Sequence, residues 1–296
     1  MRPADSLIFG FLSFLFIITV LFKKQIPDSY SILSVYTVLI AALFLLTYFK
    51  KRHKSKILEI TCDVILPVLV VVLVFDTLGS LIRHINPSTY DHFLIQLDYM
   101  IFNVHPTVAL ERFTAPVATE LLQLAYISYY FMPIILGVTL KIKGKETEFN
   151  RTVFLIILCF FLSYIGYILV PAVGPRYTMN HIQNTELHGI FLRDAINSTL
   201  NTLEGIKRDA FPSGHTAITL VVLYLAYRFQ RLLFRIFLPF VLGLIISTVY
   251  LRYHYVVDVA AGVLLFAFTI YVGEKYYNYW EKRNETNYKS QAPNYK

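Results

Sequence analysis

Long apolar stretches alternate with short polar ones along most of the chain. A helix of about 20 predominantly apolar residues is long enough to cross a bilayer, and several stretches reach or approach that length. The predicted spans run over residues 7–22, 30–49, 57–78, 121–140, 152–170, 216–227, 232–250 and 256–272. The pattern therefore predicts an all-α, polytopic membrane protein of about eight spans.

Two connections between spans carry helical patterns of their own. Residues 90–102 place apolar and polar positions at helical intervals between two prolines, which predicts an interfacial or re-entrant helix. Residues 186–203 show a similar periodicity, and we expect a surface helix there that caps the site described below. The tail from Glu274 is polar and shows no pattern of a second domain.

Composition supports the membrane class: 56% of the residues are hydrophobic and only 16% are charged, which argues against a soluble enzyme. The net charge of +8 does not indicate a nucleic-acid partner, because the basic residues gather in short clusters between spans. Cys62 and Cys159 lie within apolar runs and lack metal-ligand spacing, so we expect neither a disulfide nor a zinc site.

The basic clusters also predict the orientation. Most of the 27 lysines and arginines fall on one side of the eight-span layout, at the N-terminus and in residues 50–56, 141–151, 228–235 and beyond 273. Because loops rich in lysine and arginine face the cytoplasm, both termini are predicted to be cytoplasmic. The opposite face, where the motifs below lie, is then extracytoplasmic or lumenal.

The residues that suggest chemistry lie at the two ends of the apolar hairpin 211–258. Pro212 suits a first helical turn, while Ser213 and Gly214 leave backbone N–H groups that can point at an anion. His215 would face that anion. Because the two spans of the hairpin are joined by a basic turn, the chain returns to the face that it left.

At the other end of the hairpin, a four-residue spacing places His254 and Asp258 on one helical face. The carboxylate can then bind one ring nitrogen of the histidine and leave the other aimed outward. We therefore expect one site that combines His254, Asp258 and His215.

The Pro-Ser-Gly-His motif, together with His254 and Asp258, resembles the type 2 phosphatidic acid phosphatase superfamily. The resemblance extends over roughly the third to eighth spans and implies a six-helix catalytic core. It implies that His254 is the nucleophile that takes the phosphoryl group, that Asp258 orients it, and that His215 protonates the leaving oxygen. It implies no metal and no cofactor. The expected domains are two N-terminal spans in 1–56, a catalytic membrane domain in 57–273 and a cytoplasmic tail in 274–296.

The candidate phosphate ligands are Arg176, Ser213, Gly214 and Arg252, since arginines and N–H groups stabilise charge on phosphoryl oxygens. Two positions depart from the family pattern: Leu169 stands where a lysine is usual, and Thr248 follows Ser247 where an arginine is usual. The loss of these two phosphate ligands and the sequence around Tyr250–Tyr255 both resemble the inositol phosphorylceramide synthase branch.

The resemblance implies a membrane phosphoester hydrolase that acts on lipid phosphates through a phosphohistidine. The alternative is a phosphotransferase that moves a phospho-headgroup between lipids, such as an inositol phosphorylceramide synthase. A transporter or an inactive scaffold fits less well, because the informative polar residues gather at one face and all three expected catalytic side chains are present. The partners in either case are a lipid phosphate or phospholipid and the surrounding membrane lipids.

Four further ionisable residues can each be interpreted in two ways: Asp63, Asp76, Glu120 and Arg193. Asp63 and Asp76 lie in or near a span, where a carboxylate is either functional or close enough to the interface to be solvated. Asp76, Glu120 or Arg193 could bind a polyol, and each also reads as an interfacial charge.

Overall fold

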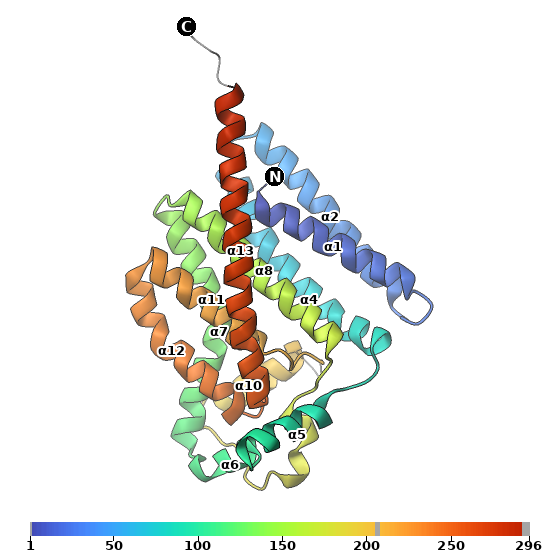
Figure 1. Cartoon of the computed structure of the whole chain (residues 1–296), viewed down its shortest axis with the longest axis vertical. Helices are drawn as coiled ribbons and strands as arrows, with labels where there is room; N and C mark the ends of the chain where they lie inside the picture. The colour runs from blue at the N-terminus through green and yellow to red at the C-terminus, as the bar shows by residue number, and fades with distance from the viewer. Residues whose placement is uncertain (1, 205–207, 292–296) are drawn as a thin grey trace.

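The computed structural model describes residues 2–204 and 208–291, and all the regular secondary structure in these ranges is helical. The long helices are α1 (Pro3–Leu21), α2 (Ser29–Arg52), α4 (Leu66–Ile85), α7 (Pro116–Ile142), α8 (Glu146–Leu169), α11 (Gly214–Phe229), α12 (Arg231–Tyr250) and α13 (Val256–Gln291). Shorter ones are α3 (Lys56–Ile60), η1 (Thr61–Ile65), α5 (Asp91–Phe102), α6 (Pro106–Ala109), η2 (Leu110–Phe113), α9 (Pro175–Thr178), η3 (Asn180–Ile182) and α10 (Arg193–Glu204). Figure 1 shows the long helices as a bundle, with α5, α6 and α10 gathered at one end.

The predicted all-α polytopic class is confirmed. In the described part of the chain, seven helical segments are long and apolar enough to cross a membrane. They are 3–21, 29–52, 56–85, 116–142, 146–169, 231–250 and 256–284. The remaining predicted span corresponds to α11, which has 16 residues and packs against α7, α8, α12 and α13. Its position inside the bundle compensates for its short length, because its neighbours cover its apolar surface.

Helix α11 carries the Pro-Ser-Gly-His end of the hairpin, so its packing positions the site. Its residues Ala217, Val221 and Ala226 are fully buried. Helix α13 approaches the start of α11 closely at Gly262, where a Cβ atom would lie 2.6 Å from the carbonyl oxygen of Ser213. A side chain there would push the two motif-bearing helices apart.

Helix α13 runs from Val256 to Gln291 without a break at Glu274, where the tail was expected to begin. The Glu274 carboxylate binds Arg151 at 2.9 Å and Arg228 at 2.6 Å, and Glu281 also pairs with Arg151. The first polar turns beyond the span are therefore tied to α8 and to the last turn of α11.

The helix predicted at 90–102 is present as α5, and two of its aspartates hold distant loops. The carboxylate of Asp91 accepts N–H groups from Val173 and Gly174 and the hydroxyl of Tyr255, at 2.9–3.0 Å. Asp98, seven residues later on the same helical face, accepts the N–H groups of Val256 and Val257 at 3.0 and 2.9 Å. Helix α5 therefore fixes both the loop before α9 and the start of α13.

The expected cap over 186–203 is helical only from Arg193 onward. The reason is Glu120, whose carboxylate accepts the N–H groups of Ile190, Leu192 and Arg193 at 2.9, 2.7 and 3.3 Å. These are donors that the first turn of a helix leaves unsatisfied, and a carboxylate is favoured beside them. Glu120 thus anchors the cap to α7.

The role of Asp98 can be tested by Asp98→Ala, which leaves the N–H groups of Val256 and Val257 without their acceptor. Buried unsatisfied donors cost about 1–3 kcal/mol, so we expect a lower unfolding temperature in detergent, measured by circular dichroism. Asp194→Ala is the matched control, because that side chain is 75% exposed. Equal unfolding temperatures for the two variants would contradict the assigned role of Asp98.

The arrangement of the helices also predicts which positions share a membrane face. Thr147 is exposed in the first turn of α8, and Ser198 is exposed on α10 at the other end of the bundle (Figure 1). Single cysteines at these positions, in a background without Cys62 and Cys159, should react with an impermeant thiol reagent from opposite sides of the membrane. Labelling of both positions from one side would be incompatible with this bundle.

Candidate active site

The two ends of the hairpin meet. His215 lies in the first turn of α11, and His254 lies in the short connection between α12 and α13. The Nε2 atom of His254 is 3.4 Å from the Nδ1 atom of His215. His254 is 4% exposed, and the backbone N–H groups of Tyr253 and His254 both bind the carbonyl oxygen of Thr248, which folds the connection tightly.

A backbone carbonyl sets the tautomer of His254. The Nδ1 atom lies 2.8 Å from the carbonyl oxygen of Ala210. Because a carbonyl only accepts hydrogen bonds, Nδ1 carries the proton and donates it. In the neutral ring the lone pair is then on Nε2, the atom that faces His215. His254 therefore presents an unprotonated nitrogen toward the second histidine.

Asp258 stands behind His254, but its contact differs from the expected helical pair. His254 precedes the first residue of α13, Val256, so the two residues do not share a helical face. The Asp258 Oδ2 atom accepts the N–H group of Tyr255 at 2.9 Å and lies 3.5 Å from Nδ1 of His254. Asp258 is fully buried, and its carboxylate lies beside the ring nitrogen that carries the proton.

Ser213 and Gly214 serve the backbone of the site. The Ser213 hydroxyl accepts the N–H group of Thr216 at 3.3 Å, which makes it the N-cap of α11. The N–H group of Ser213 donates to the carbonyl oxygen of Asp258 at 3.0 Å and so joins the two motifs. A Cβ atom at residue 214 would lie 2.2 Å from the Tyr167 hydroxyl oxygen. Both residues therefore have a role in the local fold, and the Ser213 N–H group already donates a hydrogen bond to a backbone carbonyl oxygen.

Two tyrosines of α7 pack on His215. The rings of Tyr126 and Tyr129 lie 4.6 and 4.4 Å from the ring of His215. Tyr126 also stacks on Tyr253 at 4.4 Å, and the guanidinium of Arg176 lies 5.6 Å from the Tyr253 ring. His215, Tyr126, Tyr253 and Arg176 form a column. The three-residue spacing of Tyr126 and Tyr129 was the available sequence signal.

The two candidate arginines lie beyond this column. Arg252 adopts a left-handed backbone conformation with φ of 66°, and its guanidinium binds Glu111 and the carbonyl oxygen of Thr185 at 2.9 and 2.5 Å. Burial lowers the pKa of Arg252; Glu111 opposes this shift, and nearby Arg193 adds to it. The N–H group of Arg176 donates to the carbonyl oxygen of Arg252, so the two residues are held side by side.

A cavity of about 260 Å³ opens between these arginines and the cap. Its lining comes from α7, from the segment around α9 and η3, from the cap and from the connection after α12. The lining residues are Gln123, Arg176, Asn180, Gln183, Glu186, Leu187, His188, Arg193, Asn197, Leu251, Arg252 and Tyr253. Neither histidine of the pair lines it, and Tyr253 is the wall nearest to them. We call this space the cap cavity.

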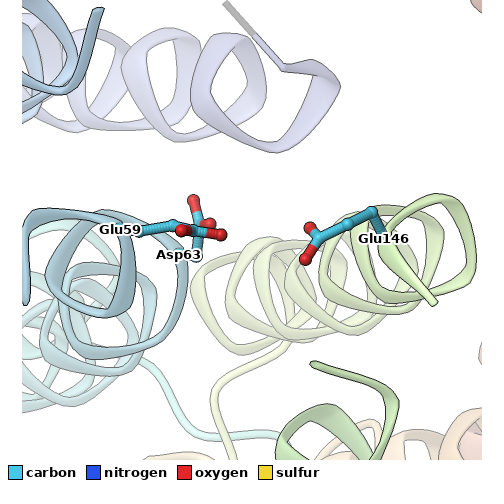
Figure 2. A group of neighbouring side chains, drawn as sticks. All are labelled: Glu59, Asp63 and Glu146. Atoms are coloured by element: carbon cyan, nitrogen blue, oxygen red, sulfur yellow. The ribbon is translucent and has the colours of Figure 1, made fainter. Parts of the chain in front are cut away.

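A group of carboxylates at the opposite end of the bundle has the spacing of a metal site. Figure 2 shows Glu59, Asp63 and Glu146, from α3, η1 and α8, pointing toward one another. The ammonium group of Lys141 binds all three, at 2.5, 3.0 and 2.9 Å. Asp63 also pairs with Arg2 and Lys50. These ion pairs account for the cluster, and Asp63 serves there to join α1, α2 and α7 rather than to take part in the histidine site.

Buried polar contacts outside the motifs complete the site. Asp98 holds the start of α13 just after His254, and burial raises the pKa of Asp98 against the effect of its two N–H donors. Burial likewise raises the pKa of Tyr255, which lies beside Asp91. The two aspartates were missed in the sequence, where their seven-residue spacing around the buried Leu94 was the only signal.

Comparison with known proteins agrees with this geometry. Over 187 residues the chain is 25% identical to a PA-phosphatase related-family protein of Dictyostelium discoideum, a match that covers 56% of this chain and 34% of that protein. The chain thus spans about a third of that relative. No solved structure matches. A family model described as the PAP2 superfamily matches residues 92–272, a range that contains α5 except its first residue, both motif ends of the hairpin and the histidine pair. The chain belongs to the PAP2 superfamily.

Proposed function

We propose that this protein is a membrane phosphoester hydrolase that acts on lipid phosphates through a phosphohistidine on His254. The observation that carries the proposal is the hydrogen bond from Nδ1 of His254 to the carbonyl oxygen of Ala210. It leaves Nε2 unprotonated, as a nucleophile must be, and Asp258 lies where it stabilises positive charge that develops on the ring.

In the first step, Nε2 of His254 attacks phosphorus, and the bond from phosphorus to the lipid oxygen breaks. The lipid oxygen leaves as an alcohol after taking a proton from His215, the general acid. In the second step, water attacks the phosphorus of the phosphohistidine and gives a proton to His215, the P–N bond breaks, and inorganic phosphate is released. His254 returns to its neutral form. Both steps use groups of this chain and water, so no metal or cofactor enters the scheme.

The two rings must separate for this reaction. A reacting nitrogen and phosphorus alone stand about 3–3.5 Å apart before attack, and the leaving oxygen lies beyond the phosphorus. The two histidine nitrogens are 3.4 Å apart, so the phosphoryl group enters only when the His215 ring moves. His215 is packed against Tyr126 and Tyr129, which therefore control where its ring can go.

Arg176 and Arg252 are the side chains we propose to stabilise charge on the phosphoryl oxygens. Arg176 has its guanidinium over aromatic rings, where it is positioned without an acidic partner among the contacts of the described residues. Arg252 already pairs with Glu111, so its share of the phosphate charge requires that pair to loosen. The catalytic unit is proposed to comprise residues 57–273, and the family match covers much of it.

Headgroup transfer between lipids is the second candidate, and the cap cavity favours it. A transferase must hold an alcohol near the phosphohistidine and limit the access of water, which calls for a covered polar pocket. The cap cavity is polar, lies under the cap and is bounded by Tyr253 on the side of the histidines. Headgroup transfer is the activity of the inositol phosphorylceramide synthases, the branch that the sequence resembles.

We further propose that both termini are cytoplasmic and that the site faces the extracytoplasmic or lumenal side. Support comes from basic residues in the last turn of α7, near the start of α8 and in the last turn of α11, namely Lys141, Arg151 and Arg228. The junction of α7 and α8 lies at the end of the bundle away from α5 and α10 (Figure 1). Basic segments that connect spans remain on the cytoplasmic side during insertion.

His254→Ala should abolish phosphate release from a lipid phosphate, because no other group takes the phosphoryl group. His215→Ala should reduce it by about 10²- to 10⁴-fold, with a smaller loss on substrates that have a good leaving group. His92→Ala is the control, since that histidine is exposed on α5. Labelled wild-type protein quenched in alkali, where the P–N bond survives, should contain phosphohistidine, and a substantial rate in His254→Ala would rule out the mechanism.

The products decide between hydrolysis and transfer. Purified protein is incubated with a labelled lipid phosphate or phospholipid in EDTA, with and without inositol, ceramide or diacylglycerol. Hydrolysis predicts that free phosphate is the main product with every acceptor and that EDTA leaves the rate unchanged. Transfer of the headgroup that outcompetes water at millimolar acceptor would replace the phosphatase by the transferase.

A further inference from the structure

The cap cavity contains buried hydrogen-bond donors that the described residues do not satisfy. Gln123 is 1% exposed, and its Nε2 atom is buried without a hydrogen-bond partner among the described residues. The same holds for the Nε atoms of Arg193 and Arg252. All three residues line the cavity, and they come from α7, α10 and the connection after α12.

Two of the three unsatisfied atoms are guanidinium nitrogens, which can only donate hydrogen bonds. Buried donors without partners are costly and rare, so three of them on residues that line one cavity point to a ligand rich in acceptors. Glu186 is the acidic residue of the lining, and its exposed carboxylate pairs with His188 at 3.2 Å. It therefore does not supply the missing acceptors.

The charge of the residues that line the cavity also favours a ligand that carries acceptors, and a negatively charged one in particular. Arg176, Arg193 and Arg252 all line it. Arg193 binds Asp194 at 2.7 Å and Arg252 binds Glu111 at 2.9 Å, each through a terminal guanidinium nitrogen, while the Nε edge stays unpaired among the described residues. The positive charge of Arg193 contributes to the lowered pKa of Arg252, after burial, so the two guanidinium groups repel each other. An anion between them would relieve that repulsion.

We propose that the cap cavity binds a phosphate-type oxyanion, separate from the phosphoryl group that His254 attacks. Phosphate oxygens match the geometry of arginine donors and accept several hydrogen bonds at once. Gln123 and Arg193 are the residues that hold it, and Tyr253, which stacks on Tyr126 and through it on His215, lies on the side of the histidine pair.

The oxyanion has two possible sources, and the choice between them rests on the proposed function. It is either a second phosphate on the lipid substrate, so that the enzyme selects lipid diphosphates, or inorganic phosphate after its release. Tyr253 stacks on Tyr126 and Tyr126 on His215, so a continuous line of ring contacts joins the cavity to the histidine pair.

Binding is measured first in the full chain carrying His254→Ala, so that turnover plays no part in the result. Calorimetric titration with inorganic phosphate and with pyrophosphate is compared between this background and three added changes. Arg193→Gln removes one donor, and Gln123→Glu replaces a donor by a negative charge; each should weaken binding by about tenfold or more. Arg112→Gln should change it less than about twofold, because this exposed arginine does not line the cavity.

Equal affinities in all three variants, or no binding of either anion, would overturn the proposal. Binding of inositol that is sensitive to Gln123→Glu, with no binding of phosphate, would identify a polyol site instead and would also overturn it. Arg193 lies on the partly exposed cap, so Arg193→Gln still tests the site if the change at the buried Gln123 disrupts folding.

The active protein then distinguishes the two sources. If the oxyanion belongs to the substrate, Arg193→Gln raises KM for a lipid diphosphate by about tenfold and leaves KM for the matching monophosphate unchanged. If it is free phosphate, the variant instead loses inhibition by inorganic phosphate. Anion binding without any turnover in the wild-type protein would refute the proposed function while leaving this site in place.

Discussion

Buried carboxylates that accept backbone N–H groups hold the active-site end of this protein together. Asp91, Asp98, Glu120 and Asp258 each bind N–H groups of a loop or helix start. In three of the four cases the partner lies 70 or more residues away in the chain. Such groups cannot be left unsatisfied when buried, so each carboxylate fixes both the position and the direction of the segment that it binds.

The consequence for the proposed chemistry is that the candidate nucleophile, His254, is positioned by the backbone. His254 takes its tautomer from a carbonyl at Ala210, which lies at the other end of the hairpin. Ala210 in turn donates its N–H group to the carbonyl oxygen of Ala172, near the loop that Asp91 binds. The motifs therefore form one hydrogen-bonded unit, within which Asp258 contributes charge behind the ring while the Ala210 carbonyl orients it.

Much of this arrangement is visible in the sequence, because it follows from periodicity and from the closure of a hairpin. The spans, helix α5 and the meeting of His215 with His254 all depend on patterns within about 50 residues. The carboxylate contacts could not be predicted in the same way, since no local pattern pairs Asp98 with Val256. The late start of α10 likewise depends on Glu120, which lies on another helix. Tertiary contacts of this kind override the propensity of a single segment.

Helix α13 gives the molecule a mechanical property that its separate contacts do not. At 1.5 Å per residue its 36 residues extend about 54 Å, from the turn that holds Asp258 to the polar turns beyond the candidate span. Near its start it is bound by Asp98, and farther along Glu274 and Glu281 pair with Arg151. A continuous helix is stiff along its axis, so the charged contacts at one end of the bundle and the carboxylate behind His254 at the other belong to one rigid element.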